Sequence, residues 1–230
     1  MRTRIVLGLL VTLFVSTPAI AATILFQDNF DNVAGSSGGT AASPTIGTWT
    51  GGGVIAVDSG TDAGFPPVSS PNHATMNAPG GGTITFAAAA NNTDILRAEF
   101  DYWPDGVAVG EGTGIDFPDT FLQFRGDGQI YMDGPFAAFT LPTNNWSHIT
   151  LDYDPVAASL KLTAGANTQT IPATGGAALA GIGYYTFGGG FGRFDNVQVT
   201  LLNVVPEPSS LGLLTSAMLG LAGYARRKRA

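Results

Sequence analysis

The chain has 230 residues and no cysteine, which excludes disulfides, thiolate metal sites and cysteine nucleophiles. Glycine is frequent, at 32 residues, and only 12% of residues are charged, so short strands joined by tight turns are favoured over long surface helices. Residues 22–204 hold four basic and sixteen acidic side chains, and the resulting net charge of −12 argues against nucleic acid as a partner.

The first 21 residues have the layout of a secretory signal peptide. Arg2 and Arg4 precede an apolar stretch at 5–15, and small residues follow at the cleavage positions. An uncleaved anchor is the alternative, but eleven apolar residues are few for a bilayer. We therefore predict an N-terminal signal helix in residues 1–21, removed by signal peptidase after Ala21.

Residues 22–204 contain short runs of alternating apolar and polar residues, separated by Gly, Pro, Asn and Asp, and no helical period. We predict a strand at 96–102 and hairpins at 121–132 and 146–163, with turns at 125–128 and 154–157. Further strands are predicted at 168–171, 183–187 and 194–201. About a dozen strands in one domain of this length predict an all-β fold of two antiparallel sheets packed as a sandwich.

The C-terminal segment, residues 205–230, has three parts in a fixed order. Pro206, Glu207 and Pro208 form an extended motif, an apolar run follows, and the chain ends with the basic cluster Arg226, Arg227, Lys228 and Arg229. With its flanking serines, the run predicts a transmembrane helix at 209–225, and the basic cluster predicts a stop-transfer signal that stays cytoplasmic. An ordinary tail anchor with a chance Pro-Glu-Pro is the alternative.

This tripartite segment resembles the PEP-CTERM sorting signal, which exosortases of Gram-negative bacteria recognise. The resemblance implies that Pro206, Glu207 and Pro208 are the recognition element and that the tail is a transient membrane anchor. It also implies export through the inner membrane and delivery to the cell surface or extracellular matrix after tail processing, often in species that make exopolysaccharide. Signal peptidase and exosortase are therefore the expected partners during export, and exopolysaccharide is a candidate ligand.

The segments 26–31 and 194–199, together with the hairpin around Trp146, are similar to parts of concanavalin A-like (laminin G-like) jelly rolls. The resemblance implies a two-sheet antiparallel jelly-roll sandwich in which the first and last strands are neighbours. Laminarinase-like glycosidases share that fold and carry a Glu-x-Asp-x-x-Glu pattern. Here Glu99 and Asp101 match its first two acids, but Pro104 occupies the third position, so no retaining pair of carboxylates is formed. We predict no catalytic residues.

Two kinds of binding residue are candidates. Asp28, Asp31 and Asp195 would come together if the first and last strands pair, and carboxylates suit a structural calcium, although aspartate is also a common turn residue. Trp103 and Trp49 are candidates for stacking on sugar rings, with core packing as the alternative. The sequence therefore predicts a non-enzymatic, surface-sorted envelope or matrix protein that binds glycan. The alternatives are a purely structural or adhesive matrix protein and, less favoured, a carbohydrate-active enzyme.

Overall fold

The computed structural model describes residues 19–31, 40–41, 44–51, 55–59, 72–76, 80–106, 112–117, 120–173, 179–187 and 193–205. Backbone contacts divide the chain into two units: residues 22–203, called the body below, and residues 1–21 together with 204–230. Residues 1–18 of the predicted signal helix and the whole predicted transmembrane helix, 209–225, lie outside the described residues, and the first strand begins at Ala19. None of the described segments is a helix with the length and apolar character needed to cross a membrane.

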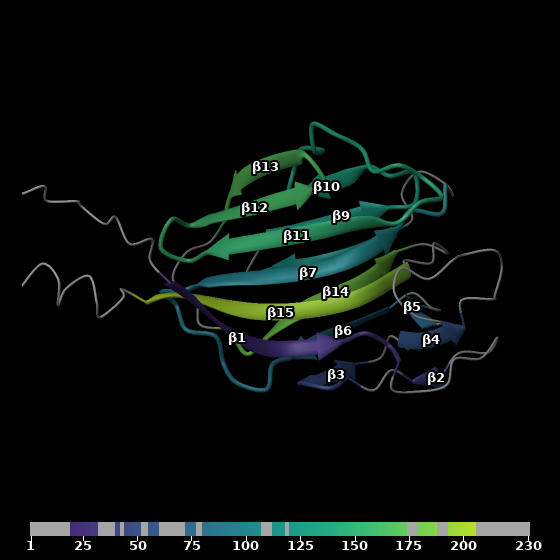
Figure 1. The fold of residues 1–230 in the computed structure, drawn as a ribbon. Coiled ribbons are helices and arrows are strands. Elements are labelled where there is room, and N and C mark those ends of the chain that lie inside the picture. The colour runs from purple at the N-terminus through teal and green to yellow at the C-terminus, as the bar shows by residue number, and fades with distance from the viewer. Residues whose placement is uncertain are drawn as a thin grey trace, which may run out of the picture. The chain divides into compact units, whose positions relative to one another are not determined.

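The larger sheet has nine strands, in the order β13-β12-β11-β7-β15-β5-β4-β2, with β1 paired to β15 beside this path (Figure 1). The pairing of β1 with β15 confirms that the first and last strands of the body are neighbours. In chain order the strands of this sheet are β1 (Ala19–Asp28), β2 (Thr40–Ala41), β4 (Ile55–Ser59), β5 (Asn72–Met76), β7 (Ile95–Trp103), β11 (Ser147–Asp154), β12 (Ser159–Ala164), β13 (Asn167–Pro172) and β15 (Arg193–Val205).

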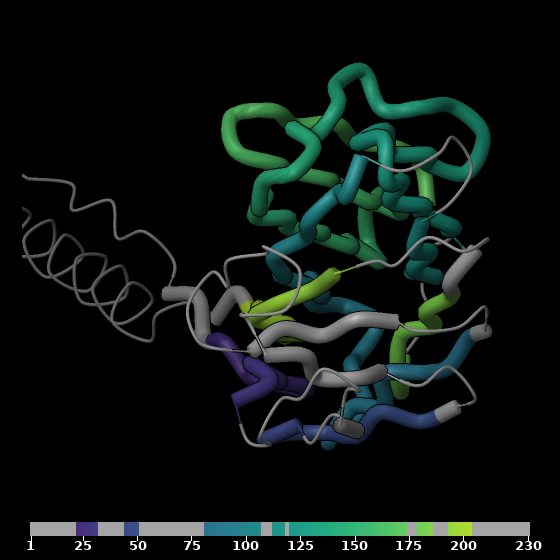
Figure 2. The backbone as a smooth tube through the Cα atoms, turned by 90° about the vertical axis from the view of Figure 1, so that its right-hand side faces the viewer, coloured from purple at the N-terminus to yellow at the C-terminus, as the bar shows by residue number. Residues whose placement is uncertain are grey.

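The smaller sheet has six strands, in the order β10-β9-β8-β14-β6-β3. Figure 2 looks approximately along the strands and shows the two sheets as separate layers of the body. Every strand pair with a defined register is antiparallel, so the predicted all-β fold with two antiparallel sheets is confirmed. The strands are β3 (Thr48–Gly51), β6 (Gly80–Thr85), β8 (Gly112–Phe117), β9 (Thr120–Arg125), β10 (Ile130–Met132) and β14 (Gly181–Phe187).

The core lies between the sheets and consists of the alternate residues of each strand. Along β11, Ile149, Leu151 and Tyr153 are buried while the residues between them are not, as the period of a half-buried strand requires. Phe26 and Phe124 are fully buried in the same cluster. The packing leaves a cavity of about 40 Å³ between the sheets. Apolar side chains line it, among them Ala98, Phe100, Ile115, Ile182, Val197 and Val199.

Both predicted hairpins are present. In the first, Gly128 has a φ of +81° and its amide donates to the carbonyl of Arg125 over 3.0 Å. A β-carbon at Gly128 would collide with the Leu141 carbonyl oxygen, so this turn requires glycine. In the second, the Asp154 carboxylate accepts hydrogen bonds from the amides of Val156 and Ala157 at 2.9 and 2.8 Å. Local turn chemistry therefore sets both hairpins, which is why the sequence reveals them.

The last strand carries an irregularity that the sequence did not predict. Its register against β7 shifts between Asp195 and Gln198, and Asn196 at the bulge has a φ of +53°. The bulge adds a residue, so the strand keeps Val197 and Val199 in the core while Asn196 faces outward. The strand also runs to Val205, four residues beyond its predicted end.

Candidate functional site

The predicted sorting residues Pro206, Glu207 and Pro208 lie outside the described residues, as does the basic cluster at 226–229. Their predicted roles therefore come from the sequence and from its comparison with known families. The other candidate residues, the three aspartates and two tryptophans, belong to the described part of the body.

The three aspartates of the predicted calcium site occupy different environments. Asp28 is fully buried, and its carboxylate accepts hydrogen bonds from the indole of Trp49 at 2.7 Å and the amide of Phe30 at 2.8 Å. Burial raises the pKa of Asp28, and these hydrogen bonds oppose the rise. Asp31 is exposed and accepts from Asn29, whereas Asp195 is fully buried. Over the described residues, no group of three or more His, Cys, Asp or Glu side chains is arranged to hold a metal ion.

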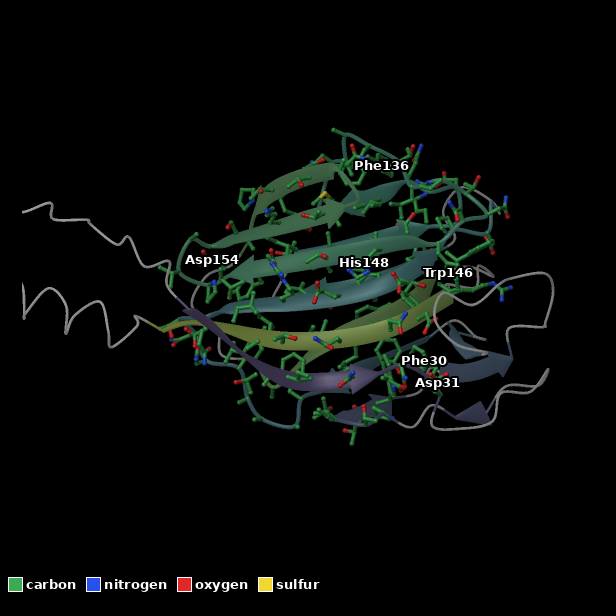
Figure 3. The ribbon with its side chains drawn as sticks, in the orientation of Figure 1. Phe30, Asp31, Phe136, Trp146, His148 and Asp154 are labelled. Carbon is green, nitrogen blue, oxygen red and sulfur yellow. The ribbon has the colours of Figure 1, made fainter. Side chains whose placement is uncertain are left out.

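The two tryptophans predicted to stack on sugars pack against other aromatic rings. Trp103, at the end of β7, is only 6% exposed and meets Trp146 edge-on at 5.5 Å (Trp146 is labelled in Figure 3). Trp49 is half-buried and lies 4.8 Å from Phe26 and 5.6 Å from Tyr184. Stacking on a sugar needs an open ring face, and these contacts cover much of both indoles. A glycan-binding role for Trp103 and Trp49 stays a prediction.

The outer face of the nine-stranded sheet is polar. His148 on β11 lies opposite Asp101 on β7, and its Nδ1 is 2.9 Å from the Asp101 carboxylate (His148 is labelled in Figure 3). Its Nε2 is 3.9 Å from Glu99, and Asn196 of the bulge donates to Asp101 over 2.9 Å. The register of the sheet thus joins residues that the sequence left separate. On the same face, Arg97 and Asp152 form an ion pair at 2.6 Å.

The outer face of the six-stranded sheet is different, because aromatic rings gather on it. We call Phe121, Tyr131, Phe136 and Tyr185 the aromatic face. Ring centroids are 5.7 Å apart for Phe136 and Tyr131, 6.4 Å for Tyr131 and Phe121, and 6.5 Å for Phe121 and Tyr185. Phe136 is 49% exposed and Tyr185 38%, and the other two rings are half-buried. The four rings therefore form a continuous group on the surface, in which Phe136 and Tyr185 are the most exposed.

Strand register explains how these rings meet. Tyr131 of β10 lies opposite Gln123 of β9, Gln123 lies opposite Gly114 of β8, and Gly114 lies opposite Tyr185 of β14. Directly opposed residues of antiparallel strands point to the same face of a sheet, so this row crosses four strands. A parallel row places Phe121 opposite Asp116. The aromatic face therefore joins three rings of one chain segment, residues 121–136, with Tyr185, which is 64 residues beyond Phe121 in the sequence.

Polar groups flank the rings. The Tyr185 hydroxyl donates a hydrogen bond to the Asp116 carboxylate, and this contact raises the pKa of Tyr185. The Arg125 guanidinium lies 5.3 Å from the centre of the Phe136 ring and 3.2 Å from the Asp127 carboxylate. Arg125 is thereby fixed beneath Phe136, with its side chain only 8% exposed. Open rings beside fixed polar groups are the arrangement that recognises sugars.

Sequence reasoning missed the aromatic face. Alternation along 121–124 and 129–132 marks Phe121 and Tyr131 as residues that face away from buried neighbours, which was the available signal. That signal does not say which strands are adjacent. Phe136 lies outside the regular strands, in an isolated bridge with Tyr131, and no periodic pattern marks such a position.

The body is an all-β sandwich of two antiparallel sheets. The C-terminal segment gives more specific information, because it matches a known sorting motif. Residues 204–229 match the PEP-CTERM protein-sorting motif, which confirms the resemblance of the C-terminal segment and indicates export and membrane-associated sorting. No curated protein sequence matches the chain.

Several solved structures resemble the body at low identity. Arcelin-5, a lectin-like defence protein from Phaseolus vulgaris, is 8% identical over 81% of this chain and 99% of its own, with a TM-score of 0.48. Lectin II from Ulex europaeus is 10% identical over 82% and 100%, with a TM-score of 0.44. Domain 4 of AbnA, an extracellular arabinanase of Geobacillus stearothermophilus, is 18% identical over 80% and 95%, with a TM-score of 0.45.

Proposed function

We propose that this chain is an exported protein, sorted to the cell surface or extracellular matrix, whose body binds glycan through the aromatic face without catalysing a reaction. The observation that supports the binding role is the group of four adjacent, surface-exposed or half-exposed rings with polar groups beside them. Signal peptidase and exosortase act on the two ends of the chain during export, and the sorting motif supports this part. Exopolysaccharide made by the same cell is the expected ligand.

The chemistry of the aromatic face suits a neutral sugar better than a nucleic acid. Sugars present C–H groups that pack on aromatic rings and hydroxyls that need hydrogen-bond partners, and this face offers both. The negative charge of residues 22–204 would repel nucleic acid and strongly anionic polysaccharides. A neutral glycan meets no such repulsion.

A glycan array tests the proposal, using the full-length chain in detergent micelles, with and without calcium, and including the exopolysaccharide of the source cells. We expect reproducible binding that Tyr185→Ala weakens about tenfold, or about 1.4 kcal/mol, which is the scale of one lost aromatic contact. Val156→Ala is the matched control, because Val156 is 74% exposed in a turn between β11 and β12, outside the aromatic face.

Two results would contradict the proposal in different ways. Binding that disappears with Trp103→Ala but survives Tyr185→Ala would place the glycan site at the predicted tryptophans. Absence of binding to every glycan on the array would favour a purely structural or adhesive matrix protein, provided that circular dichroism and cooperative melting show the chain to be folded.

A further inference from the structure

Tyr185 lies flat against the backbone of the six-stranded sheet. A β-carbon built on Gly81, which faces it on β6, would lie 2.6 Å from Cδ1 and 2.9 Å from Cε1 of its ring. A β-carbon on Gly183 would lie 3.4 Å from its hydroxyl oxygen. The ring therefore covers Gly81, where a β-carbon would collide with it, and its hydroxyl reaches Gly183 at ordinary contact distance, while the residue as a whole is 38% exposed. A flat, open ring is a ready-made platform for stacking.

Asp116 lies at one end of this platform. A β-carbon on Gly183 would be 3.1 Å from the β-carbon of Asp116, so the same glycine lets the carboxylate approach the ring. The Tyr185 hydroxyl lies beside this carboxylate, and their interaction raises the pKa of Tyr185. An ionised carboxylate has about four lone-pair positions, and the tyrosine uses one of them. Sugar hydroxyls that reach the platform would thus meet a strong, positioned acceptor.

The rings of the aromatic face are not coplanar. The planes of Phe121 and Tyr185 differ by 59°, those of Phe121 and Tyr131 by 56°, and those of Tyr131 and Phe136 by 76°. A flat crystalline polysaccharide needs coplanar rings to contact several chains at once. Inclined rings fit instead a single chain whose successive sugars turn relative to one another.

We propose that Tyr185 and Asp116 form the primary subsite of the glycan-binding face, which holds one sugar of a single, neutral, soluble glycan chain. The sugar stacks its C–H face on the Tyr185 ring and donates hydroxyls to Asp116, while Phe121 and Tyr131 contact the following sugars. This inference rests on the proposed function, since it names the ligand class and the residues that select it. Gly81 acts as a positioning residue, because it leaves room for the ring without touching the sugar.

Affinity electrophoresis tests this subsite, using the full-length chain in detergent and gels that each contain one soluble neutral polysaccharide: β-glucan, arabinoxylan or galactomannan. A parallel pull-down uses microcrystalline cellulose as the crystalline probe. The variants are Tyr185→Phe, Tyr185→Ala, Asp116→Asn and Gly81→Ala, with Val156→Ala as the matched control. Melting temperatures are recorded for every variant, so that lost binding is interpreted only for folded protein.

We expect retardation by at least one soluble polysaccharide and no retention on cellulose. Tyr185→Ala should weaken binding about tenfold and Asp116→Asn severalfold. Tyr185→Phe keeps the ring and loses only its bond to Asp116, so it should weaken binding less than Tyr185→Ala. Gly81→Ala should weaken binding with all binding residues intact, because the new methyl group lifts the ring.

Failure of the subsite and failure of the proposed function give different results. Soluble-chain binding that is unchanged in Tyr185→Ala and Asp116→Asn would overturn the subsite and leave glycan binding in place. Retention on cellulose without binding to soluble chains would overturn the ligand class. Absence of binding to every probe and to the glycan array would overturn the proposed function and the subsite together.

Discussion

The contact between Trp49 and Asp28 gives the sharpest stability prediction. The indole N–H of Trp49 donates to the fully buried Asp28 carboxylate over 2.7 Å, and the same indole packs against Phe26, Phe30 and Tyr184. Trp49→Phe keeps an aromatic ring at this position and removes the donor. The variant therefore leaves a buried carboxylate with one hydrogen bond fewer.

The expected cost follows from these contacts. A hydrogen bond to a charged group contributes about 1.5–3 kcal/mol, and the lost five-membered ring removes about 1 kcal/mol of apolar burial. The free energy of unfolding should therefore fall by about 3 kcal/mol. For a body of this size, each kcal/mol lowers the melting temperature by about 2–4 °C, so a drop of about 6–12 °C is expected.

Urea unfolding at neutral pH, followed by far-ultraviolet circular dichroism, measures this cost. A double-mutant cycle with Asp28→Ala separates the hydrogen bond from the packing of the ring, because alanine offers the indole no acceptor, whereas asparagine would keep one. A coupling energy of about 1.5 kcal/mol or more is expected. A coupling energy below about 0.5 kcal/mol would refute the reasoning, since it would show that the carboxylate does not depend on the indole.

The pH dependence of the same pair has a definite sign. Burial raises the pKa of Asp28 in the folded chain above its ordinary value of 3.8, so the folded state favours the protonated carboxyl. The stability that Asp28 contributes is fully present below pH 3.8 and is lost as the pH rises through the folded-state pKa. Asp28→Asn should remove this loss, and urea unfolding of both proteins across pH 3 to 7 checks it.

Three further predictions concern the core, the tail and calcium. Val197→Ile adds a methylene beside the 40 Å³ cavity and should raise the free energy of unfolding by about 0.8 kcal/mol in urea unfolding; a loss would mean that the cavity cannot accept the group. Deletion of residues 205–230 should abolish membrane retention and leave export intact, as fractionation of expressing cells would show; continued retention would contradict the sorting role. If calcium binds at Asp28, Asp31 and Asp195, it offsets the cost of burying two of these carboxylates, and a chelator should then lower the melting temperature. An unchanged melt would remove these three residues from consideration as a metal site.

Much of the fold was predictable because its signals are local. The hairpins β9–β10 and β11–β12 follow from alternating runs on either side of turns that contain Gly128 or begin at Asp154, and both were confirmed. The neighbouring first and last strands were also predicted, from the resemblance of the two ends of the body. The bulge at Asn196 was not, because an extra residue in a strand leaves no periodic mark.

The candidate site was not predictable in the same way. The sequence indicated Trp103 as a candidate, because tryptophan is a rare residue type and Trp103 lies at a strand end. In the structure Trp103 is buried against Trp146. The residues that form the aromatic face are ordinary outward positions of separate strands. Each is unremarkable alone, and their importance comes only from being adjacent.

The sequence by itself determined the sorting signal of this protein and its class of fold. A sorting motif is read as a linear segment, and alternation with a period of two is a property of each strand alone, so neither needs long-range contacts. The tertiary structure decided which face of the sandwich carries the group of exposed aromatic rings. Strand order and register brought Tyr131, Phe121 and Tyr185 together on one face and placed Gly81 opposite Tyr185, whereas in the opposite sheet His148 lies beside Asp101 and Glu99. Pairing between distant strands is set by the packing of the whole core, and no local segment encodes it.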